Sequence, residues 1–287
     1  MTFLYKSNDF AFRAIGEKAK ELVDLFALVE ELDGSPMRSN RYQRCRNELA
    51  EQFSTTVKFL NEYQDFFTMN ENTKVLNVGS GISASSLALA LTGASVTGLE
   101  FDPKFIEVAK EFIEFSRAHL KQYGIFTGNI SSTETFSYPD ESFDVVFCAN
   151  VLEKVKNPAE FIRELSRITK PGGIIIIRQR FSLAPNNLRR DPHYGLPIVA
   201  VLPKLLRKTI AVNFMHRGSK LREEHWPLTH SQLRNWISSA LDLHIDKWST
   251  SAYGRWPAWK SRTAASVIGL KKTVREGVRG KESVTTI

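Results

Sequence analysis

Apolar residues recur at spacings of three and four in two N-terminal stretches, which predicts amphipathic helices over residues ~8–33 and ~40–67. The segment "ELDGSPMRSN" separates the two stretches, since its glycine and proline break a helical pattern. We expect both apolar stripes to pack on a core or to form part of a lid over a ligand. The stripes comprise Phe12, Ile15, Ala19, Leu22, Phe26 and Val29, then Tyr42, Cys45, Leu49, Phe53, Val57, Leu60 and Tyr63.

The periodicity changes at Lys74, where short apolar runs begin to alternate with helical segments. Runs such as "KVLNVG", "SVTGLE" and "FDVVFCANV" are typical of strands buried on both faces. Strands alternating with helices predict a parallel sheet covered by helices on both sides. Past residue ~182 the pattern is less regular: "THSQLRNWISSALD" predicts a helix capped by Thr229 or Ser231, and "LHIDKWS" and "AASVIGLKK" predict two strands.

A glycine-rich turn follows the first of the buried runs. The run ends in Gly79-Ser80-Gly81, where the absence of a Cβ on glycine lets a ligand approach the backbone closely. Glu100 ends the next run about 20 residues later, the distance at which an acid typically accepts both hydroxyls of a ribose. The pattern therefore predicts a nucleoside cofactor. Gly79-x-Gly81-x-x-Ala84 also fits the dinucleotide pattern, so NAD remains an alternative at this point.

Composition and charge indicate the kind of protein and the cellular compartment in which this predicted domain occurs. The chain has 287 residues, of which 42% are hydrophobic, so it can bury a sizeable core. Its cysteines, Cys45 and Cys148, suggest neither a disulfide framework nor a zinc site. Early charges argue against a signal peptide, and no apolar run is long enough to span a membrane, so we expect a soluble, cytoplasmic protein. Lys and Arg concentrate after Arg178, and this basic third could face a phosphate-bearing substrate, nucleic acid or a membrane surface.

Four segments together resemble the class I S-adenosylmethionine-dependent methyltransferases. "VLNVGSGIS" resembles the first motif of that family, usually written V-L-D-V/I-G-x-G-x-G, and "GLEFDP" resembles its second. "GNI" resembles the motif that meets the adenine edge. "PDESFDVVFCANVLEKVKNPAEFIRELSRITKPGGIIII" resembles the long segment over strand four, its helix and strand five, and is the most specific match. A nicotinamide dehydrogenase has no reason to carry that last segment.

The resemblance implies a fold and a cofactor. The fold is α/β, a Rossmann-like, doubly wound, mostly parallel seven-stranded sheet with an antiparallel C-terminal strand, plus N-terminal helices and an acceptor-side insertion. The cofactor is S-adenosyl-L-methionine. Four positions depart from the family pattern: Asn77 and Asn129 stand where the family usually has Asp, Ser83 replaces the third glycine, and Lys154 replaces a frequent His.

The resemblance also implies cofactor-binding residues. Glu100 would hold the ribose diol, Phe101 would pack on the adenine, and Asn129 and Ile130 would meet the adenine edge. The remaining residues are Asn77, Gly79, Ser80 and Gly81 around the methionine and ribose, and Cys148, Ala149 and Asn150 near the sulfonium. Cys148 is also compatible with a plain buried position.

Candidate catalytic residues lie past the glycine loop. Methyl transfer needs an aligned acceptor, and a hydroxyl acceptor gains from a general base. In "RRDPHYGLP", Asp191 could orient His193 as that base, although Asp-Pro-His is also an ordinary turn. Glu153, after strand four, could touch the acceptor or the cofactor. The six histidines show no metal-binding spacing, so we expect no metal.

These predictions combine into four regions and one leading function. The regions are an N-terminal helical cap (1–70), a cofactor-binding core (71–180), an acceptor-side insertion (181–228), and a C-terminal helix and strands that complete the sheet (229–287). The leading function is methyl transfer to a small-molecule, glycan or lipid-linked acceptor, and the basic C-terminal third favours an anionic acceptor or contact with a membrane surface. The alternatives are a nucleic-acid methyltransferase, which is less favoured because no N-P-P-Y-type motif follows strand four, and a cofactor-binding module without catalysis.

Overall fold

Seven strands form one sheet in this computed structural model. It describes residues 10–26, 40–63, 68–126, 128–179, 202, 206, 209–210, 229–240, 242–251 and 265–273. The strand order is β3-β2-β1-β4-β5-β7-β6. The strands are β1 (Lys74–Val78), β2 (Ser95–Leu99), β3 (Asn129–Thr133), β4 (Phe143–Ala149), β5 (Thr169–Gln179), β6 (Leu243–Ser251) and β7 (Ala265–Lys272).

Strand direction agrees with the predicted topology. β1 pairs in parallel with β2 and with β4, β2 pairs in parallel with β3, and β4 with β5. β7 lies antiparallel between β5 and β6. The prediction of a doubly wound, mostly parallel seven-stranded sheet with an antiparallel C-terminal strand is therefore confirmed. In such a sheet the carboxyl ends of the parallel strands meet at one edge, which is where ligands bind.

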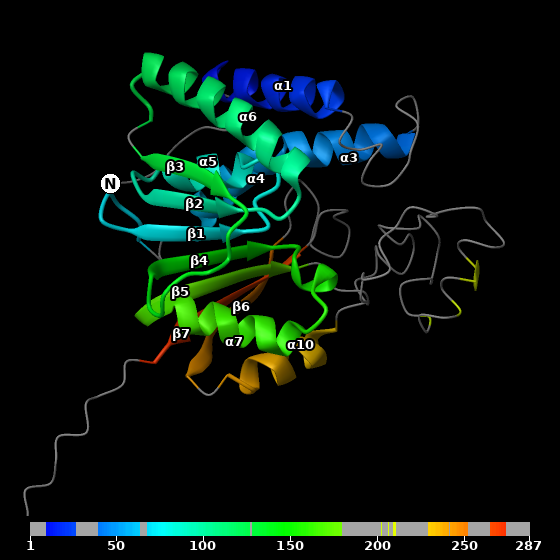
Figure 1. The fold of residues 1–287 in the computed structure, drawn as a ribbon, viewed down its shortest axis with the longest axis vertical. Helices are drawn as coiled ribbons and strands as arrows, with labels where there is room; N and C mark the ends of the chain where they lie inside the picture. The colour runs from blue at the N-terminus through cyan, green and yellow to red at the C-terminus, as the bar shows by residue number, and fades with distance from the viewer. Residues whose placement is uncertain are drawn as a thin grey trace, which may run out of the picture.

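Helices cover both faces of this sheet (Figure 1). One face carries α1 (Phe10–Leu25), α4 (Gln52–Glu62), α5 (Ala84–Ala90) and α6 (Pro103–Gln122), with α3 (Asn40–Ala50) beside α1. The other face carries α7 (Pro158–Ile168) and α10 (His230–Ser238). None of the helices in the described part of the chain is long and apolar enough to cross a membrane.

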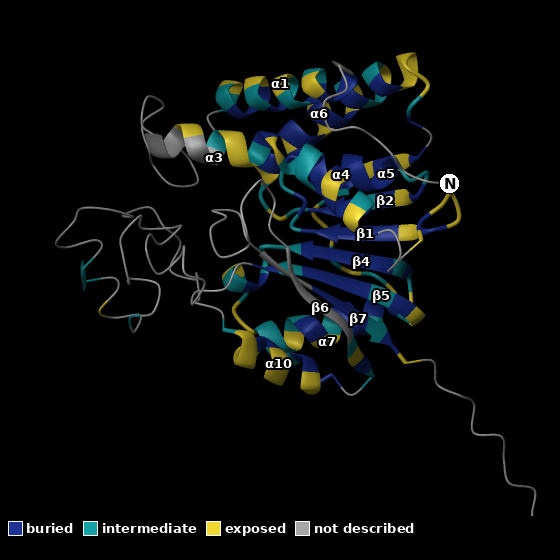
Figure 2. Cartoon of the chain, turned by 180° about the vertical axis from the view of Figure 1, so that it is seen from behind, coloured by how far each residue is buried: buried dark blue, intermediate teal, exposed yellow. Residues whose placement is uncertain are grey.

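Two hydrophobic clusters result from this layering. Successive strand residues point to opposite faces, so Val75 joins the cluster under α1, α4, α5 and α6, whereas Leu76 joins the cluster under α7 and α10. Both side chains are fully buried. Figure 2 shows the central strands β1 and β4 as almost continuously buried between helices whose outer surfaces are exposed. The continuous apolar runs in the sequence follow from this burial on both faces.

The second predicted helix is divided in the structure. Residues ~40–67 were expected as one element, but α3 ends at Ala50 and α4 begins at Gln52, with a turn at Glu51. The hydroxyl groups of Ser54 and Thr55 donate to the carbonyl of Glu51 at 3.1 and 2.9 Å. Such bonds from a side chain to the preceding turn compete with the helical ladder and bend it. Helical hydrogen bonds continue across the turn, from the N–H of Glu51 to the carbonyl of Asn47 and from the N–H of Thr55 to the carbonyl of Glu51, and α4 packs against α5.

Capping residues fix where several helices begin. Thr229 caps α10: its hydroxyl accepts from the N–H of Gln232, and the Gln232 side chain accepts in return from the N–H of Thr229. This capping box selects Thr229 over Ser231, the other predicted cap. Asp102 caps α6 by accepting from the N–H of Lys104 at 3.1 Å. Of the predicted insertion 181–228, the structure describes only residues 202, 206 and 209–210, so the division into four regions stays a prediction.

Candidate cofactor and active site

The turn after β1 is held against the end of β2. The N–H groups of Gly79 and Ser80 both donate to the carbonyl of Leu99, at 2.8 and 2.9 Å. Gly79 has φ +69° and Gly81 has φ +55°, a left-handed backbone conformation that glycine adopts without steric cost. Ser83 has φ +62° at the start of α5, so the residue that replaces the third glycine of the pattern pays the cost of that conformation.

Glu100 connects this turn to the carboxyl end of β2. Its Oε2 accepts from the N–H of Gly81 at 2.8 Å, and its Oε1 accepts from the N–H groups of Phe101 and Asp102 at 2.9 and 3.2 Å. A carboxylate oxygen can accept two hydrogen bonds. Oε2 therefore keeps one acceptor position, and a second hydroxyl would have to displace one of the backbone donors. The carboxylate is oriented by the chain before any ligand arrives.

Asn77 lies beneath the turn and is used structurally. It is 2% exposed, and its Nδ2 donates to Ser86 Oγ at 2.8 Å. β2 passes so close that a Cβ at Gly98 would lie 2.9 Å from Ser80 Oγ. The hydroxyls of Ser80 and Ser83 are buried and find no hydrogen-bond partner among the described residues. Buried hydroxyls normally have a partner, so these two are compatible with a polar ligand at the loop.

The turn after β4 packs against the glycine loop. Cys148 and Ala149 end the strand, and Asn150 follows with φ +54° and donates its N–H to the carbonyl of Arg178 at 2.9 Å. A Cβ on Gly79 would lie only 2.4 Å from Cγ2 of Val151. Glycine is therefore required at position 79 for two reasons, its φ and the space that Val151 occupies. The carboxyl ends of β1 and β4 thus lie in direct contact.

Cys148 behaves as a buried apolar residue. Its side chain is 1% exposed, and burial raises the pKa of its thiol well above the ordinary value, with a further contribution from the negative charge of Glu153. The thiolate is the nucleophilic form of cysteine, and the thiol of Cys148 stays protonated at neutral pH, so Cys148 does not act as a nucleophile. Its backbone position at the end of β4 is what places it near the site.

Glu153 is one of the three predicted catalytic residues, and it lies on the 3-10 turn η1 (Leu152–Lys154). Its Oε2 accepts from Nε2 of Gln179, the last residue of β5, at 2.7 Å. This pair joins the carboxyl ends of β4 and β5, next to the turn that contacts Gly79. The other two predicted catalytic residues, Asp191 and His193, lie outside the described residues.

The structure corrects the predicted contacts of Asn129 and Ile130. Asn129 begins β3 and pairs with Ser95, the first residue of β2, so both lie at the amino edge of the sheet. The four steps from Asn129 to Thr133 span about 13 Å, which separates Asn129 from the glycine loop at the opposite edge. Ile130 is buried in the cluster under α6. Neither residue can therefore meet an adenine held beside Glu100.

The residues that do end β3 were missed. The carbonyl of Thr133 accepts from the N–H of Glu100 at 3.0 Å, which places Thr133 beside the ribose-binding candidate. Phe136 follows, with its ring centroid 6.2 Å from that of Phe101, whose side chain is 58% exposed. Pairing the five residues of β3 with the five of β2 places Thr133 beside Leu99 at the carboxyl edge. The sequence alone does not show where β3 begins, so it could not give this pairing.

Comparison with known proteins assigns part of the chain to a family. Residues 76–177 match the family described as a methyltransferase domain. The chain is 32% identical over 136 residues to a demethylmenaquinone methyltransferase of Tropheryma whipplei, covering 47% of this chain and 52% of that protein. It is 37% identical over 103 residues to a ubiquinone biosynthesis O-methyltransferase of Proteus mirabilis, covering 35% of this chain and 39% of that protein. The chain thus spans about half, or less, of the length of these relatives.

A solved structure agrees in fold. Magnesium protoporphyrin IX methyltransferase from Synechocystis, with bound SAH, matches with a TM-score of 0.51 and 13% identity, covering 82% of this chain and 94% of that chain. At that identity the likeness shows the fold alone.

The sheet order, with a glycine loop facing an acid at the next strand end, defines a doubly wound α/β protein of the nucleoside-cofactor type. Within that class, residues 76–177 match the methyltransferase domain family, which agrees with the resemblance to the class I S-adenosylmethionine-dependent methyltransferases and with S-adenosylmethionine as the cofactor.

Proposed function

We propose that this protein transfers a methyl group from S-adenosylmethionine to a small-molecule acceptor. The observation that carries the proposal is the hydrogen bond between Glu100 Oε2 and the N–H of Gly81, which joins the acid ending β2 to the glycine turn after β1. Two buried hydroxyls without a partner among the described residues, those of Ser80 and Ser83, provide further polar groups at this loop. The residues present therefore fit the cofactor.

When bound, S-adenosylmethionine supplies an electrophilic methyl group on a sulfonium. The protein's part is to bind, align and exclude water. In this proposal Glu100 holds the ribose, and the exposed ring of Phe101, with Phe136 beside it, packs on the adenine. The Val151 side chain against Gly79 leaves no room for water between the two turns at that point. Cys148 to Asn150 present the carboxyl end of β4 toward the reacting atoms.

Glu153 and Gln179 are the described residues that support a role at the acceptor side. Their hydrogen bond of 2.7 Å fixes a carboxylate at the carboxyl ends of β4 and β5. A carboxylate at that place can accept the proton of an acceptor hydroxyl. It can also orient that hydroxyl by a hydrogen bond without taking the proton. Asp191 and His193 remain the alternative general-base pair that we propose on sequence alone.

The acceptor class is the finer part of the proposal. The named relatives are a demethylmenaquinone methyltransferase and a ubiquinone biosynthesis O-methyltransferase, which supports a quinone-precursor type of acceptor with a hydroxyl or ring carbon to methylate. The basic residues after Arg178 support the second candidate, an anionic glycan or lipid-linked acceptor. Incubation with a labelled methyl donor and a panel of hydroxyquinones, glycans and polyprenyl-linked sugars separates these classes by which one becomes labelled.

Cofactor binding is tested by titration calorimetry with S-adenosylmethionine and with NAD. We expect heat of binding with S-adenosylmethionine and none with NAD. Glu100→Ala should weaken S-adenosylmethionine binding by about 1.5–3 kcal/mol, because a charged acceptor of hydrogen bonds is lost. Binding of NAD without binding of S-adenosylmethionine would refute the proposal. Binding without any labelled product from any acceptor would favour a cofactor-binding module without catalysis.

The general base is tested separately in turnover. With a hydroxyl acceptor, the variant that removes the true base should lower turnover by about 10²- to 10⁴-fold while the affinity for the donor barely changes. Glu153→Gln and His193→Ala are the pair to compare. Loss in the first alone assigns the base to the β4 turn, and loss in the second alone assigns it to the Asp191–His193 segment. Full activity in both variants would exclude either residue as the base.

A further inference from the structure

Gln52, the first residue of α4, lies over the glycine loop. Its Oε1 is 3.9 Å from the position that a Cβ on Gly81 would occupy, and Cδ1 of Phe105 is 3.8 Å from the same position. The open side of Gly81 is therefore bordered by an amide from α4 and a ring from α6. The amide of Gln52 makes no hydrogen bond with the residues that the structure describes, although it lies beside a backbone that the family uses for cofactor binding.

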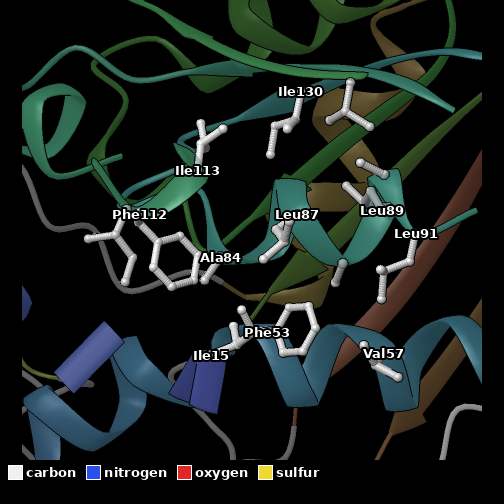
Figure 3. Packing of buried hydrophobic residues seen from close by; sticks show 14 of the residues in the cluster. Ile15, Phe53, Val57, Ala84, Leu87, Leu89, Leu91, Phe112, Ile113 and Ile130 are labelled. Carbon is white, nitrogen blue, oxygen red and sulfur yellow. The ribbon is translucent and has the colours of Figure 1, made fainter. Parts of the chain in front are cut away.

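Helix α4 is fixed at this place by its buried face. Phe53, the neighbour of Gln52, is 1% exposed, and its ring meets the edge of Phe12 on α1 with centroids 5.1 Å apart. One turn later, Thr56 Oγ1 donates to Ser85 Oγ on α5 at 3.0 Å, and both residues are buried. Figure 3 shows the ring of Phe53 on the side of α4 that faces Ala84 and Leu87 on α5. The position of Gln52 is thus set by packing and not by a free loop.

We propose that Gln52 binds the amino-acid end of the cofactor, an inference that rests on the proposed function. Glu100 lies at the end of β2, so it accounts for the ribose. Gln52 of α4 faces the Cβ side of Gly81, whereas Glu100 accepts from the N–H of Gly81. A group contributed from there meets the part of the cofactor that runs away from the ribose.

The chemistry of a primary amide matches an α-amino acid. The amide NH₂ donates and the amide oxygen accepts, so one side chain can bond both to a carboxylate and to an ammonium group. Because the amide is neutral, it suits a zwitterion, whose two charges sum to zero. A carboxylate at the same place would repel the carboxylate of the cofactor, and an aliphatic side chain would leave both charges unmatched at this point.

Two ligands separate this contact from the rest of the cofactor site. S-adenosylhomocysteine carries the amino-acid end, whereas methylthioadenosine keeps the adenosine and the sulfur but lacks it. Dissociation constants for both are measured by calorimetry on the full chain, on Gln52→Leu and on Gln52→Glu. Lys58→Leu, an exposed position on the same helix, serves as the matched control. Thermal unfolding without ligand verifies that α4 stays packed in every variant.

We expect Gln52→Leu to weaken S-adenosylhomocysteine binding about tenfold to a hundredfold, the usual loss for a hydrogen bond to a charged group. Gln52→Glu should weaken it by about tenfold or more, because like charges then face each other. Methylthioadenosine should bind all variants within about twofold, and Lys58→Leu should match the wild type. Unchanged binding of S-adenosylhomocysteine in both Gln52 variants overturns the inference, as does an equal loss for the two ligands. Failure of the wild type to bind S-adenosylhomocysteine would instead refute the proposed function itself.

Discussion

The carboxyl and amino edges of the sheet differ in how their charges are paired. At the carboxyl edge, Glu100 is held by three backbone N–H groups and Glu153 by an amide, and neither forms an ion pair with the described residues. At the amino edge, Lys170 Nζ lies 2.7 Å from Asp144 Oδ1, and Arg167 pairs with Asp140 and Glu164. Left-handed backbone turns occur at both edges: Gly79 at the carboxyl edge and Gly124 at the amino edge have the same φ of +69°.

This difference indicates a division of labour. Carboxylates that are oriented by hydrogen bonds but form no ion pair can still bind a ligand through their charge. The negative charge at the carboxyl edge is therefore available for ligand binding and is not used in an ion pair that stabilises the fold. Paired charges contribute to stability and leave little for a ligand. Changes at the carboxyl edge should therefore affect cofactor binding most, and changes at the amino edge should affect stability alone.

Gly79→Ala should produce the largest effect. The new methyl group adds a clash with Val151 at 2.4 Å to the cost of a positive φ, so we expect a loss of about 3–5 kcal/mol in the free energy of unfolding and weak binding of S-adenosylhomocysteine. Gly124→Ala is the matched control, because it has the same φ and nothing within 4 Å. Urea unfolding and calorimetry measure both effects. Equal costs for the two variants would show that the contact with Val151 does not matter.

Lys272→Met should give the next largest effect, and on stability only. Lys272 is 9% exposed, and its Nζ donates to the carbonyls of Ser166 and Thr169 at 3.0 and 2.7 Å, at the end of α7. Removing the ammonium leaves these carbonyls without that donor, at a cost of about 2–4 kcal/mol in the free energy of unfolding. The dissociation constant of S-adenosylhomocysteine should stay within about twofold. A change in affinity as large as that in Glu100→Ala would break the proposed separation of the edges.

Asp144→Asn should have a smaller, pH-dependent effect. Partial burial acts to raise the pKa of Asp144, but the hydrogen bonds from Lys170 and from the N–H of Lys74 outweigh it, so the pKa lies below its ordinary value. A lowered pKa stabilises the fold above the pKa of the unfolded chain, and the contribution disappears as the pH falls through the pKa of the folded state.

With solvent screening, the variant should be less stable than the wild type by about 1 kcal/mol or less at pH 7. The difference should fade in acid below the ordinary carboxyl pKa of about 4. Urea unfolding at several pH values follows it. A difference that grows as the pH falls would contradict the assigned sign.

Ser83→Gly should have the smallest effect and the opposite sign. Glycine removes the steric cost of φ +62°, about 1–2 kcal/mol, but makes the unfolded chain more flexible, which takes back about 0.5–1 kcal/mol. We expect a net gain of roughly 0.5–1 kcal/mol in the free energy of unfolding. Thermal unfolding without ligand measures the gain. A clear loss of stability would mean that the buried hydroxyl has a structural partner.

The sequence predicted those parts of the fold that depend on burial. Runs such as "KVLNVG" become strands because both faces of the sheet are covered, and the glycine turn is visible because few other residues tolerate its backbone. The start of β3 was not predictable, since pairing with β2 decides it, and Asn129 was therefore assigned to the wrong edge. The place of Gln52 depends on the packing of α4 against α5, residues ~30 positions apart, which no local pattern reveals.

The position of β7 has a consequence for synthesis on the ribosome. β7 pairs with β5 along Ile174 to Gln179, yet it is made about 90 residues later than β5. Among the described strands, β6, which is made in between, pairs with β7 alone. Until Ala265 to Lys272 emerge, the isoleucine-rich edge of β5 has no strand to cover it, and an uncovered edge of that kind invites pairing between nascent chains. The growing chain therefore passes through a period in which this edge is open to pairing with another chain.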